Sequence, residues 1–450
     1  MRNLIYLFFV LIIVSCSTDD GGETPVKPTP TPVSEAKPIA VDDSAETKED
    51  EELVISGLLD NDTVVTGSRI TSTDTETSKG GTITDNRNGT YTYVPASDYV
   101  GEDTFTYKLC DQDSNCSTGT VTITVIDAGS PVAVNDEAST VTSVSITINN
   151  LAANDDTTDE AKITSVDDSN SSGSVVLNSN GSVSYTPGNG FQGQDSFTYS
   201  LCDDDEVASC STATVTVNVL EPVAFNIPSE LKEYYKELPI TTNGDLNFNF
   251  VADHTIENHT TILSYGQRHE FLYNADADLD NPDNVILMYT GESRYYEEYT
   301  SGNNPYSPQT FNTEHIFPQS KLSTEDAVTD LHHLRSADDA INSLRSNYPF
   351  VDGSGTYKLV NENSWFPGDE WKGDVARMVL YLNVRYGEEF VKVGGLDLFL
   401  KWNKEDPVSA FEMQRNEVIY AAQGNRNIFI DNPYIATLIW GGASAENKWN

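Results

Sequence analysis

The chain carries the segment GEDTFTY at residues 101–107 and a near copy of it, GQDSFTY, at residues 193–199. Two further pairs of segments repeat at the same spacing: PIAVDD (38–43) with PVAVND (131–136), and NGTYTYVP (88–95) with NGSVSYTP (180–187). Similarity at a fixed period of about ninety residues indicates two copies of one structural unit.

Each copy consists of short runs of Val, Thr, Ile and Tyr in which apolar and polar residues alternate, broken by Asn, Asp and Gly turns. The copies end on the alternating runs TVTITV (120–125) and TVTVNV (214–219). Alternation with period two, interrupted by turns, is typical of antiparallel sandwiches. We therefore expect two all-β sandwich repeats, at residues 38–127 and 131–220.

Four of the five cysteines lie in two close pairs, at equivalent places in the two repeats. They are Cys110 with Cys116, and Cys202 with Cys210. Each pair brackets an acidic turn between two strand-like runs, and an even number of cysteines in an exported chain indicates disulfides. Free thiols or a metal site are the alternatives, and no His lies near either pair in the sequence.

The N-terminus has the pattern of a targeting segment. Arg2 precedes an apolar run at residues 4–14 that is too short to span a bilayer as a helix. The run ends in IVSC at residues 13–16, which resembles the lipobox of bacterial lipoproteins. This resemblance implies a signal peptide at 1–15 and a lipid on Cys16, whereas a plain secretory signal is the alternative.

A Pro/Thr-rich tether is expected to follow at residues 16–37, because its composition offers nothing to bury. The lipid anchor would make this an outer-membrane lipoprotein of the cell envelope, exposed at the surface or extracellular. No obligate protein partner is indicated.

The composition changes after residue 221, where longer helical patterns replace the Thr and Val runs. All five Trp and all six His lie beyond this point. Residues 222–450, hereafter the C-terminal region, are therefore expected to form a separate domain that holds the chemistry.

Polar residues are densest in three segments of this region: FNTEHIFP (311–318), DLHHL (330–334) and the set Asn342, Arg345 and Asn347. Pro318 predicts the end of a short strand. Ser336 with Asp339 is a plausible helix cap, which predicts a helix from about residue 337. Such a helix would carry Asn342 and Arg345 on one face.

These segments resemble the endonuclease I family of bacterial extracellular and periplasmic nucleases, whose active site is a ββα-metal (His-Me finger) motif. The resemblance implies an α+β nuclease in which His315 is the general base. It also implies that Glu314 and Asn342 hold a divalent cation, either Mg²⁺ or another such as Mn²⁺ or Ca²⁺. Arg345 would either meet a phosphate or anchor the helix. Supporting roles are expected for Asp330, His332 and Asn347.

The two repeats resemble the cadherin-like, Ig-like tandem domains of bacterial surface proteins. Four carboxylates of the first repeat would be candidate Ca²⁺ ligands: Asp42, Asp43, Asp62 and Asp103. The alternative is that they are turn residues and solvated charges.

The chain is strongly acidic, with a formal net charge of -44. The C-terminal region has 17 Lys and Arg against 34 Asp and Glu, a balance of -17. Such a surface repels nucleic acid, so a few basic residues are expected to line the cleft. Residues 316–329, where the family often has a phosphate-binding Arg, contain Lys321 and no Arg. Either Lys321, Arg335 or Arg345 takes the place of that Arg, or stabilisation of the transition state is weaker. The basic residues expected to line the cleft are Lys321, Arg335, Arg345, Arg377, Arg385, Arg415 and Arg426.

The sequence thus predicts a surface-anchored, sequence-nonspecific, metal-dependent endonuclease that cleaves DNA, RNA or both to 5′-phosphate products. The alternative is an adhesin or surface binding protein whose nuclease-like domain is inactive. A zinc hydrolase is excluded because no helix carries a His-x-x-x-His pair.

Overall fold

The computed structural model describes residues 36–205 and 208–450. The predicted signal peptide, Cys16 and nearly all of the tether lie outside these residues. Within the described parts, no helix combines the length and apolar character needed to cross a bilayer. The chain divides into two compact units with the boundary after Ala128, and each is described separately.

The first repeat is a sandwich of two sheets, in the orders β1-β7-β6-β3 and β2-β5-β4. Its strands are β1 (Asp43–Lys48), β2 (Leu53–Ser56), β3 (Arg69–Thr73), β4 (Thr82–Asp85), β5 (Thr90–Val94), β6 (Gly101–Cys110) and β7 (Cys116–Ile126). Burial alternates along β6 and β7. The alternation places Phe105, Tyr107 and Leu109 of β6 in the same core cluster as Val121 and Ile123 of β7.

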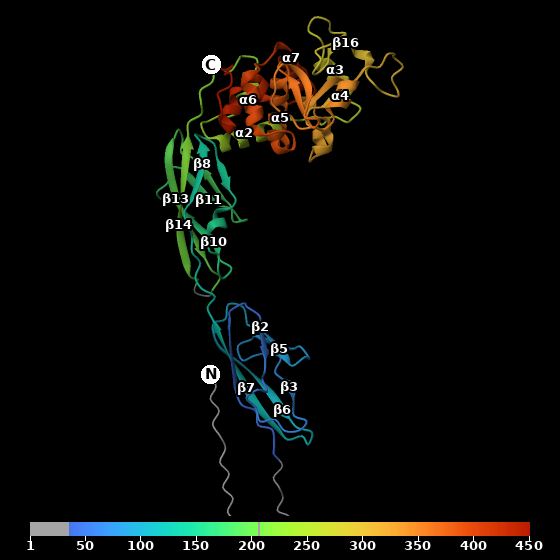
Figure 1. Cartoon of the computed structure of the whole chain (residues 1–450). Helices are drawn as coiled ribbons and strands as arrows, with labels where there is room; N and C mark the ends of the chain where they lie inside the picture. The colour runs from blue at the N-terminus through green and yellow to red at the C-terminus, as the bar shows by residue number, and fades with distance from the viewer. Residues whose placement is uncertain (1–35, 206–207) are drawn as a thin grey trace, which may run out of the picture. The chain divides into compact units, whose positions relative to one another are not determined.

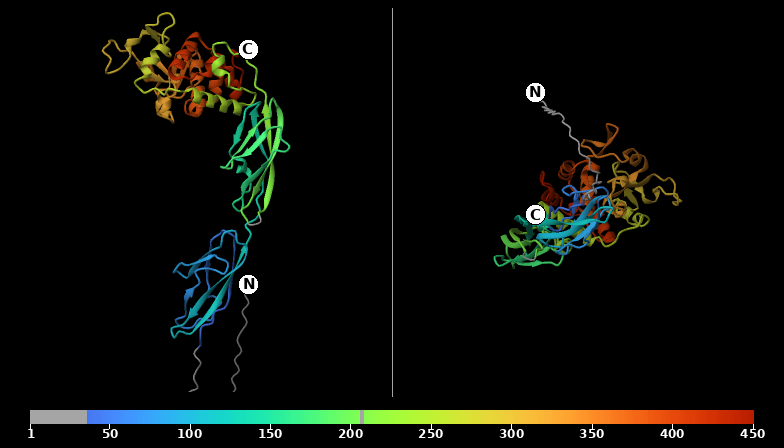
Figure 2. Two further views of the ribbon diagram at one scale, coloured as in Figure 1. Left: turned by 180° about the vertical axis from the view of Figure 1, so that it is seen from behind. Right: turned by 90° about the horizontal axis from the view of Figure 1, so that it is seen from below.

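The second repeat has the same plan, with sheets in the orders β10-β13-β14-β8 and β11-β12-β9. Its elements are β8 (Asp136–Val141), β9 (Ile146–Ile148), the 3-10 turn η1 (Leu151–Asn154), β10 (Lys162–Asp167), β11 (Ser174–Leu177), β12 (Val183–Thr186), β13 (Gly193–Cys202) and β14 (Cys210–Leu220). The long pair β13–β14 can be followed from two sides in Figures 1 and 2.

Neither sandwich is wholly antiparallel, which differs from the expectation. The first strand of each repeat pairs in parallel with the last, β1 with β7 and β8 with β14. Alternation along a strand fixes which residues face the core, but it carries no information on the direction of the neighbouring strand. The all-β sandwich class itself is confirmed.

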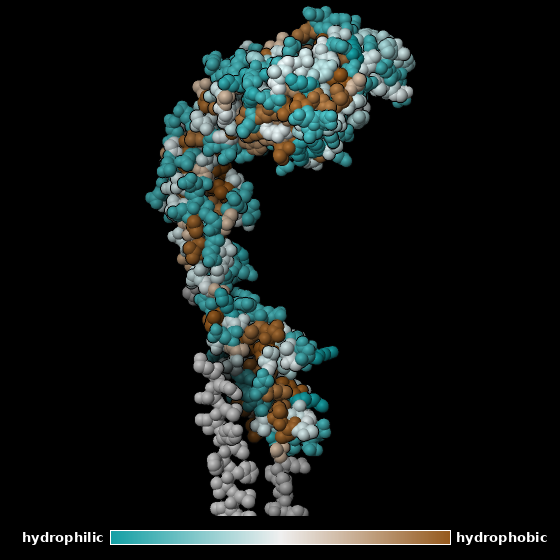
Figure 3. Space-filling view, in the orientation of Figure 1, coloured by the Kyte–Doolittle hydropathy of each residue, from teal (hydrophilic) through white to brown (hydrophobic). Residues whose placement is uncertain are grey.

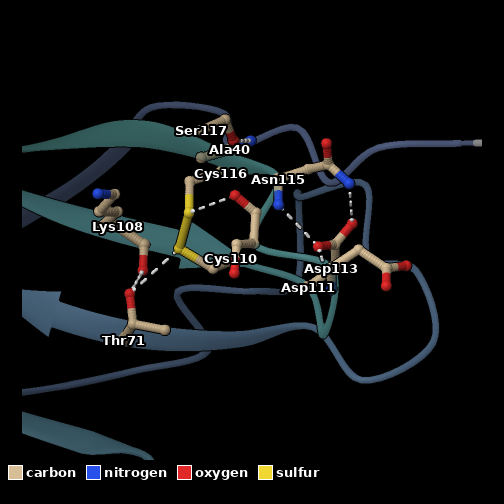
Figure 4. Close-up of a disulfide and its surroundings, with 10 residues drawn as sticks. Ala40, Thr71, Lys108, Cys110, Asp111, Asp113, Asn115, Cys116 and Ser117 are labelled. Carbon is tan, nitrogen blue, oxygen red and sulfur yellow. Dashed lines mark hydrogen bonds between the residues drawn. A yellow bond between two sulfur atoms is a disulfide. The ribbon is translucent and has the colours of Figure 1, made fainter.

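Both predicted disulfides are present, and each closes the hairpin between the two longest strands of its repeat. They join Cys110 to Cys116 and Cys202 to Cys210. In the first hairpin the acidic turn is ordered by Asp111, which accepts hydrogen bonds from the backbone and the side-chain amide of Asn115 (Figure 4). The disulfides therefore hold hairpin tips rather than linking the two sheets.

The C-terminal region is a mixed α/β fold. Its helices are α1 (Lys232–Tyr235), α2 (Gly244–Asn258), α3 (Arg268–Ala275), α4 (Asp339–Arg345), α5 (Lys372–Tyr386), α6 (Leu396–Glu405), α7 (Ala410–Gln423), α8 (Ile428–Asp431) and α9 (Tyr434–Trp440). Its strands are β15 (Asn284–Ile286), β16 (Ser293–Tyr295), β17 (Phe311–His315), β18 (Leu334–Asp338), β19 (Thr356–Val360) and β20 (Ser364–Gly368). Short 3-10 turns connect them: η2 (Tyr296–Glu298), η3 (Gln319–Lys321), η4 (Asp326–Thr329), η5 (Leu331–His333) and η6 (Phe390–Lys392).

Helix α5 forms the centre of this region. Nearly all of its residues from Gly373 to Val384 are buried, and α6 packs beside it (Figure 1). Apolar residues of α2, α6, α8, α9 and β20 complete the core around it. The hairpin β17–β18 and the following helix α4 lie in sequence order strand, strand, helix.

The expected start of the helix near residue 337 is wrong. Residues 334–338 are the strand β18, and α4 begins at Asp339. Asp338 is the cap, because its Oδ1 accepts from the backbone N–H groups of Ala340 and Ile341. The backbone N–H of Ser336 instead donates to the buried carboxylate of Asp276, which holds this residue in the strand.

Candidate active site in the strand–strand–helix motif

The segments singled out in the sequence come together in the β17–β18–α4 motif. Strands β17 and β18 are antiparallel, with Glu314 opposite Arg335 and His315 opposite Leu334. Helix α4 is tied to β17 by Asn342, whose Nδ2 donates to Asn312 Oδ1 at 2.6 Å and to the carbonyl of Thr313 at 3.3 Å. Asn342 is thereby fixed beside the strand that carries Glu314.

Glu314 is almost completely buried, with 3% of its surface exposed. Its Oε1 accepts a hydrogen bond from the Tyr289 hydroxyl at 2.8 Å and lies 3.0 Å from Nε of Arg345. Burial raises the pKa of Glu314, and the favourable charge of Arg345 and the Tyr289 hydrogen bond offset only part of this effect. Two neighbours therefore fix one carboxylate oxygen, and Oε2 is the oxygen that can take a further ligand.

Arg345 is fully buried. Its Nη2 donates to the carbonyl of Ile316 and its Nη1 to that of Ser346, both at 2.7 Å. Its guanidinium also lies over the ring of Phe350, 4.8 Å from the centroid. Of the two interpretations of Arg345, this geometry favours anchoring over phosphate contact.

Tyr289 is a site residue that sequence reasoning missed. It precedes the β17 motif by more than twenty residues, in a segment without a recognisable pattern. Its φ is 70°, which is rare for a bulky residue, and its ring packs on Trp365. Such backbone strain often marks functional sites, but it cannot be read from the sequence.

The ring of His315 is held by a main-chain carbonyl. Its Nε2 lies 3.1 Å from the oxygen of Val328. Because a carbonyl only accepts hydrogen bonds, Nε2 carries the proton, and in the neutral ring Nδ1 is the nitrogen with the lone pair. This tautomer places the basic nitrogen on the side of the ring opposite Val328.

Asp330 and His332 belong to a buried network of hydrogen bonds that joins the segment before β18 to α5 and α7. Asp330 Oδ1 accepts from the backbone of His332 and from Gln423, while Oδ2 accepts from the hydroxyls of Tyr381 and Tyr386. Burial by itself would raise the pKa of Asp330, but the nearby histidines and these hydrogen bonds lower it overall. The carboxylate is thus charged and fully used in holding the scaffold.

His332 is equally enclosed, and its Nε2 donates to the carbonyl of Asn425 at 3.3 Å. Burial lowers the pKa of His332 to about 4, so the ring is neutral near pH 7. Asn347, the last supporting candidate, is exposed beyond the end of α4. Asp330 and His332 therefore stabilise the scaffold of the site, whereas the geometry supports no such role for Asn347.

Most of the arginines that were candidates for lining the cleft are instead buried in ion pairs. Arg335, Arg377 and Arg415 are buried, each with 1% exposure or less. They pair with acidic groups from other parts of the fold: Arg335 with Asp276 and Asp374, Arg377 with Glu412, and Arg415 with Asp276. Arg426 is also largely buried and pairs with Glu417 and Asp431.

Two of the proposed cations are partly exposed, Lys321 and Arg385. Lys321 donates to the carbonyl of Lys392 at 2.9 Å. Burial, and then the nearby charge of Arg345, lower the pKa of Lys321. The face of the C-terminal region seen in Figure 3 is largely teal and white, with hydrophobic residues gathered near its middle.

The donor set of the motif fits a hard divalent cation. Glu314 Oε2 and Asn342 Oδ1 are oxygen donors of the kind that Mg²⁺, Mn²⁺ and Ca²⁺ prefer. The amide nitrogen of Asn342 faces the strand, so its oxygen is the atom that can coordinate. Two protein oxygens leave most coordination positions to water and phosphate, as is usual for Mg²⁺ sites.

The carboxylates proposed as Ca²⁺ ligands in the first repeat differ in their use: Asp103 is held by the fold, whereas Oδ2 of Asp43 and Oδ2 of Asp62 are buried without a hydrogen-bond partner among the described residues. Asp103 is fully buried and accepts from the hydroxyls of Thr77, Ser78 and Tyr93. Asp62 Oδ1 accepts from the Tyr107 hydroxyl. The Asp103 contacts favour the structural interpretation for this residue.

Known families match both parts of the chain. The Endonuclease I model matches residues 251–434, and the bacterial Ig domain model matches residues 35–124 and 128–218. An extracellular ribonuclease of Bacillus amyloliquefaciens is 40% identical over 237 residues, which cover 47% of this chain and 79% of that protein.

Two further relatives extend this comparison. An extracellular ribonuclease of Bacillus subtilis is 39% identical over 212 residues, or 42% of this chain and 72% of that protein. An extracellular deoxyribonuclease of Aeromonas hydrophila is 30% identical over 112 residues, or 23% of this chain and 49% of that protein.

Proposed function

This chain belongs to the endonuclease I family, and we propose that its C-terminal region is a secreted, divalent-metal-dependent endonuclease that hydrolyses phosphodiester bonds. The observation that carries the proposal is the β17–β18–α4 motif, which brings Glu314, His315 and Asn342 onto one hairpin and its helix. Relatives of this chain include an extracellular ribonuclease and an extracellular deoxyribonuclease. Two Ig-like repeats precede this region.

His315 is the proposed general base. Its Nδ1 takes a proton from the attacking water, while the Val328 carbonyl holds Nε2. An imidazole suits this role because its ordinary pKa lies near neutral pH. By the family resemblance, the products carry 5′-phosphate and 3′-hydroxyl ends.

Glu314 and Asn342 are the proposed ligands of the divalent cation, with Mg²⁺ as the first candidate. When bound, such an ion offsets the negative charge of the phosphate and of the departing oxygen. Arg345 and Tyr289 orient the Glu314 carboxylate through its Oε1. Arg345 is therefore a positioning residue in this proposal, and Lys321 takes the phosphate contact.

We propose that RNA is cleaved at least as well as DNA. The two ribonucleases are 40% and 39% identical to this chain, compared with 30% for the deoxyribonuclease. Their alignments cover 237 and 212 residues, whereas that of the deoxyribonuclease covers 112. The acidic surface implies few phosphate contacts, so activity should fall only modestly as salt rises.

Anchoring to the outer membrane through a lipid on Cys16 is a further part of the proposal. It rests on the resemblance of residues 13–16 to a lipobox. A Cys16→Ser variant would move the protein from the membrane fraction to the soluble fraction of its host. Recovery of this variant in the membrane fraction would contradict the anchor.

The test of the enzyme is cleavage of plasmid DNA and of a structured RNA by the purified protein. We expect cleavage with Mg²⁺, its loss with EDTA, and its loss in His315→Ala. Ser343→Ala, at an exposed position of α4, is the control. No cleavage of either substrate with Mg²⁺, Mn²⁺ or Ca²⁺ would overturn the proposal and favour a binding protein with an inactive nuclease-like domain.

A further inference from the structure

A second histidine lies directly beside the proposed base. His333 ends η5, immediately before β18, and its carbonyl accepts from the backbone N–H of Ile316 at 3.0 Å. The rings of His315 and His333 have centroids 5.6 Å apart and are tilted by 60°. Whereas His315 is partly exposed, His333 has no exposed surface.

Both rings are fastened to the same short turn, η4. Nε2 of His333 lies 2.6 Å from the carbonyl oxygen of Ala327, and Nε2 of His315 lies 3.1 Å from that of Val328, the next residue. Each carbonyl accepts, so each Nε2 carries the proton. Two consecutive carbonyls of one turn therefore set the same tautomer in two adjacent rings.

The chain before the turn is exposed, and it is held at Ser323, whose backbone N–H and hydroxyl donate to the buried carboxylate of Glu388. Residues 323–326 are exposed, and Ala327 is the first buried residue of η4. Within the turn the backbone bonds run from Val328 to Glu325 and from Asp330 to Ala327, at 3.0 and 3.3 Å. The short hydrogen bond from His333 thus ties the buried end of the turn to the hairpin that carries the base.

His333 is not placed to act on a substrate itself. It is fully buried, its Nδ1 has no hydrogen-bond partner among the residues that the structure describes, and burial lowers its pKa. A neutral ring without access to solvent neither binds phosphate nor delivers a proton to a leaving group. What it does contact is the turn and the ring of His315.

We propose that His333 is a positioning residue: by holding the Ala327 carbonyl, it keeps the Val328 carbonyl on Nε2 of His315 and so fixes the tautomer of the base. This proposal rests on the role of His315 as general base. Loss of the His333 anchor lets η4 shift, after which His315 can lose its carbonyl partner and populate the wrong tautomer. A small displacement of a reacting group is costly to catalysis even when the substrate still binds.

The test compares His333→Leu with His333→Gln. Leu fills much of the space and removes the donor, whereas Gln can place an amide N–H near the position of the imidazole Nε2. We expect His333→Leu to lower kcat about tenfold or more with KM within about twofold, and His333→Gln to recover most of this loss. Equal kcat in the wild type and a folded His333→Leu would overturn the proposal, as would equal losses in the two folded variants.

A second measurement does not depend on activity. The full-length protein, labelled with ¹⁵N in its histidine rings, would give the tautomer of His315 by NMR, assigned from the spectrum of His315→Ala. The wild type and His333→Gln should show Nε2–H, and His333→Leu a mixture of tautomers. His254→Leu, a control on α2, should leave the His315 signals unchanged.

The two proposals fail in different ways. An inactive wild type with the expected tautomer pattern would contradict the nuclease while leaving the positioning by His333 intact. A single Nε2–H tautomer of His315 in a folded His333→Leu variant would contradict the positioning while leaving the nuclease intact.

Discussion

Arg345 and Glu314 form a buried ion pair, with Nε of the arginine 3.0 Å from Oε1 of the glutamate. The arginine comes from the end of α4 and the glutamate from β17, so the pair joins the helix to the strand. Arg345 also donates to the carbonyl of Ile316, just beyond the strand. The orientation of a proposed metal ligand thus depends on a cation that never reaches the surface.

Replacing Arg345 with Met should destabilise the C-terminal region by about 3–5 kcal/mol, because the change leaves the Glu314 carboxylate buried without its partner. Urea unfolding followed by Trp fluorescence measures this, since all five Trp lie in this region. Lys358→Met, which removes an exposed cation, should change the free energy of unfolding by less than about 0.5 kcal/mol. An Arg345→Met variant with normal stability and a raised KM would instead indicate a phosphate contact.

Replacing Asn342 with Ala should raise the Mg²⁺ concentration needed for half-maximal cleavage by about tenfold or more, because the site loses one of two protein oxygens and the tie to Asn312. The measurement is cleavage rate against Mg²⁺ concentration at saturating substrate. Ser343→Ala, one residue further along α4, should give the wild-type curve. An unchanged Mg²⁺ dependence in Asn342→Ala would remove this residue from the cation site.

Lys321→Ala should raise KM with little change in kcat, and should reduce the slope of log affinity against log salt by about one, as expected for one lost phosphate contact. Fluorescence anisotropy with a short RNA, in the His315→Ala background, measures binding without cleavage. Lys358→Ala is the matched loss of one positive charge away from the motif. Identical salt slopes for the Lys321→Ala and Lys358→Ala proteins would rule out a specific contact.

The stability of the C-terminal region should fall as the pH decreases from about 6.5 to about 4. Burial lowers the pKa of His332 from 6.5 to about 4, so in this range the unfolded chain takes up a proton that the folded protein excludes. The contribution of this one group is about 3 kcal/mol, and it is lost on going from pH 7 to pH 4.

His332→Gln isolates this effect, because Gln can donate to the Asn425 carbonyl without titrating. The difference in unfolding free energy between wild type and variant should change by about 3 kcal/mol between pH 7 and pH 4. The other buried histidines contribute equally to both proteins. Parallel curves for the two proteins would show that His332 has an ordinary pKa.

Loss of the first disulfide should weaken the first repeat alone. Its two cysteines are only six residues apart in the sequence, and closing so short a loop stabilises by about 2 kcal/mol. The double variant Cys110→Ser with Cys116→Ser should therefore unfold earlier by circular dichroism. Its cleavage activity and its Trp unfolding midpoint should match the wild type, and a fall in either would link the repeat to the active site.

The sequence by itself determined the features that are encoded in local pattern. The repeat, the alternation of its strands and the two Cys pairs predicted two disulfide-bearing sandwiches, because a strand and its hairpin are specified by neighbouring residues. The resemblance of the segments that carry Glu314, His315 and Asn342 to the endonuclease I family implied a strand–strand–helix nuclease motif, and it could be recognised because each of these segments is short and continuous in the chain.

Only the tertiary structure decided which polar residues are buried and with whom. Arg335, Arg377 and Arg415 resemble surface cations in the sequence, yet each pairs with an acid from a distant segment. A guanidinium is stable inside a protein only where the fold supplies such a partner, and no local pattern encodes it. For the same reason Tyr289 behind Glu314, and His333 beside His315, became visible only when the chain had folded around them.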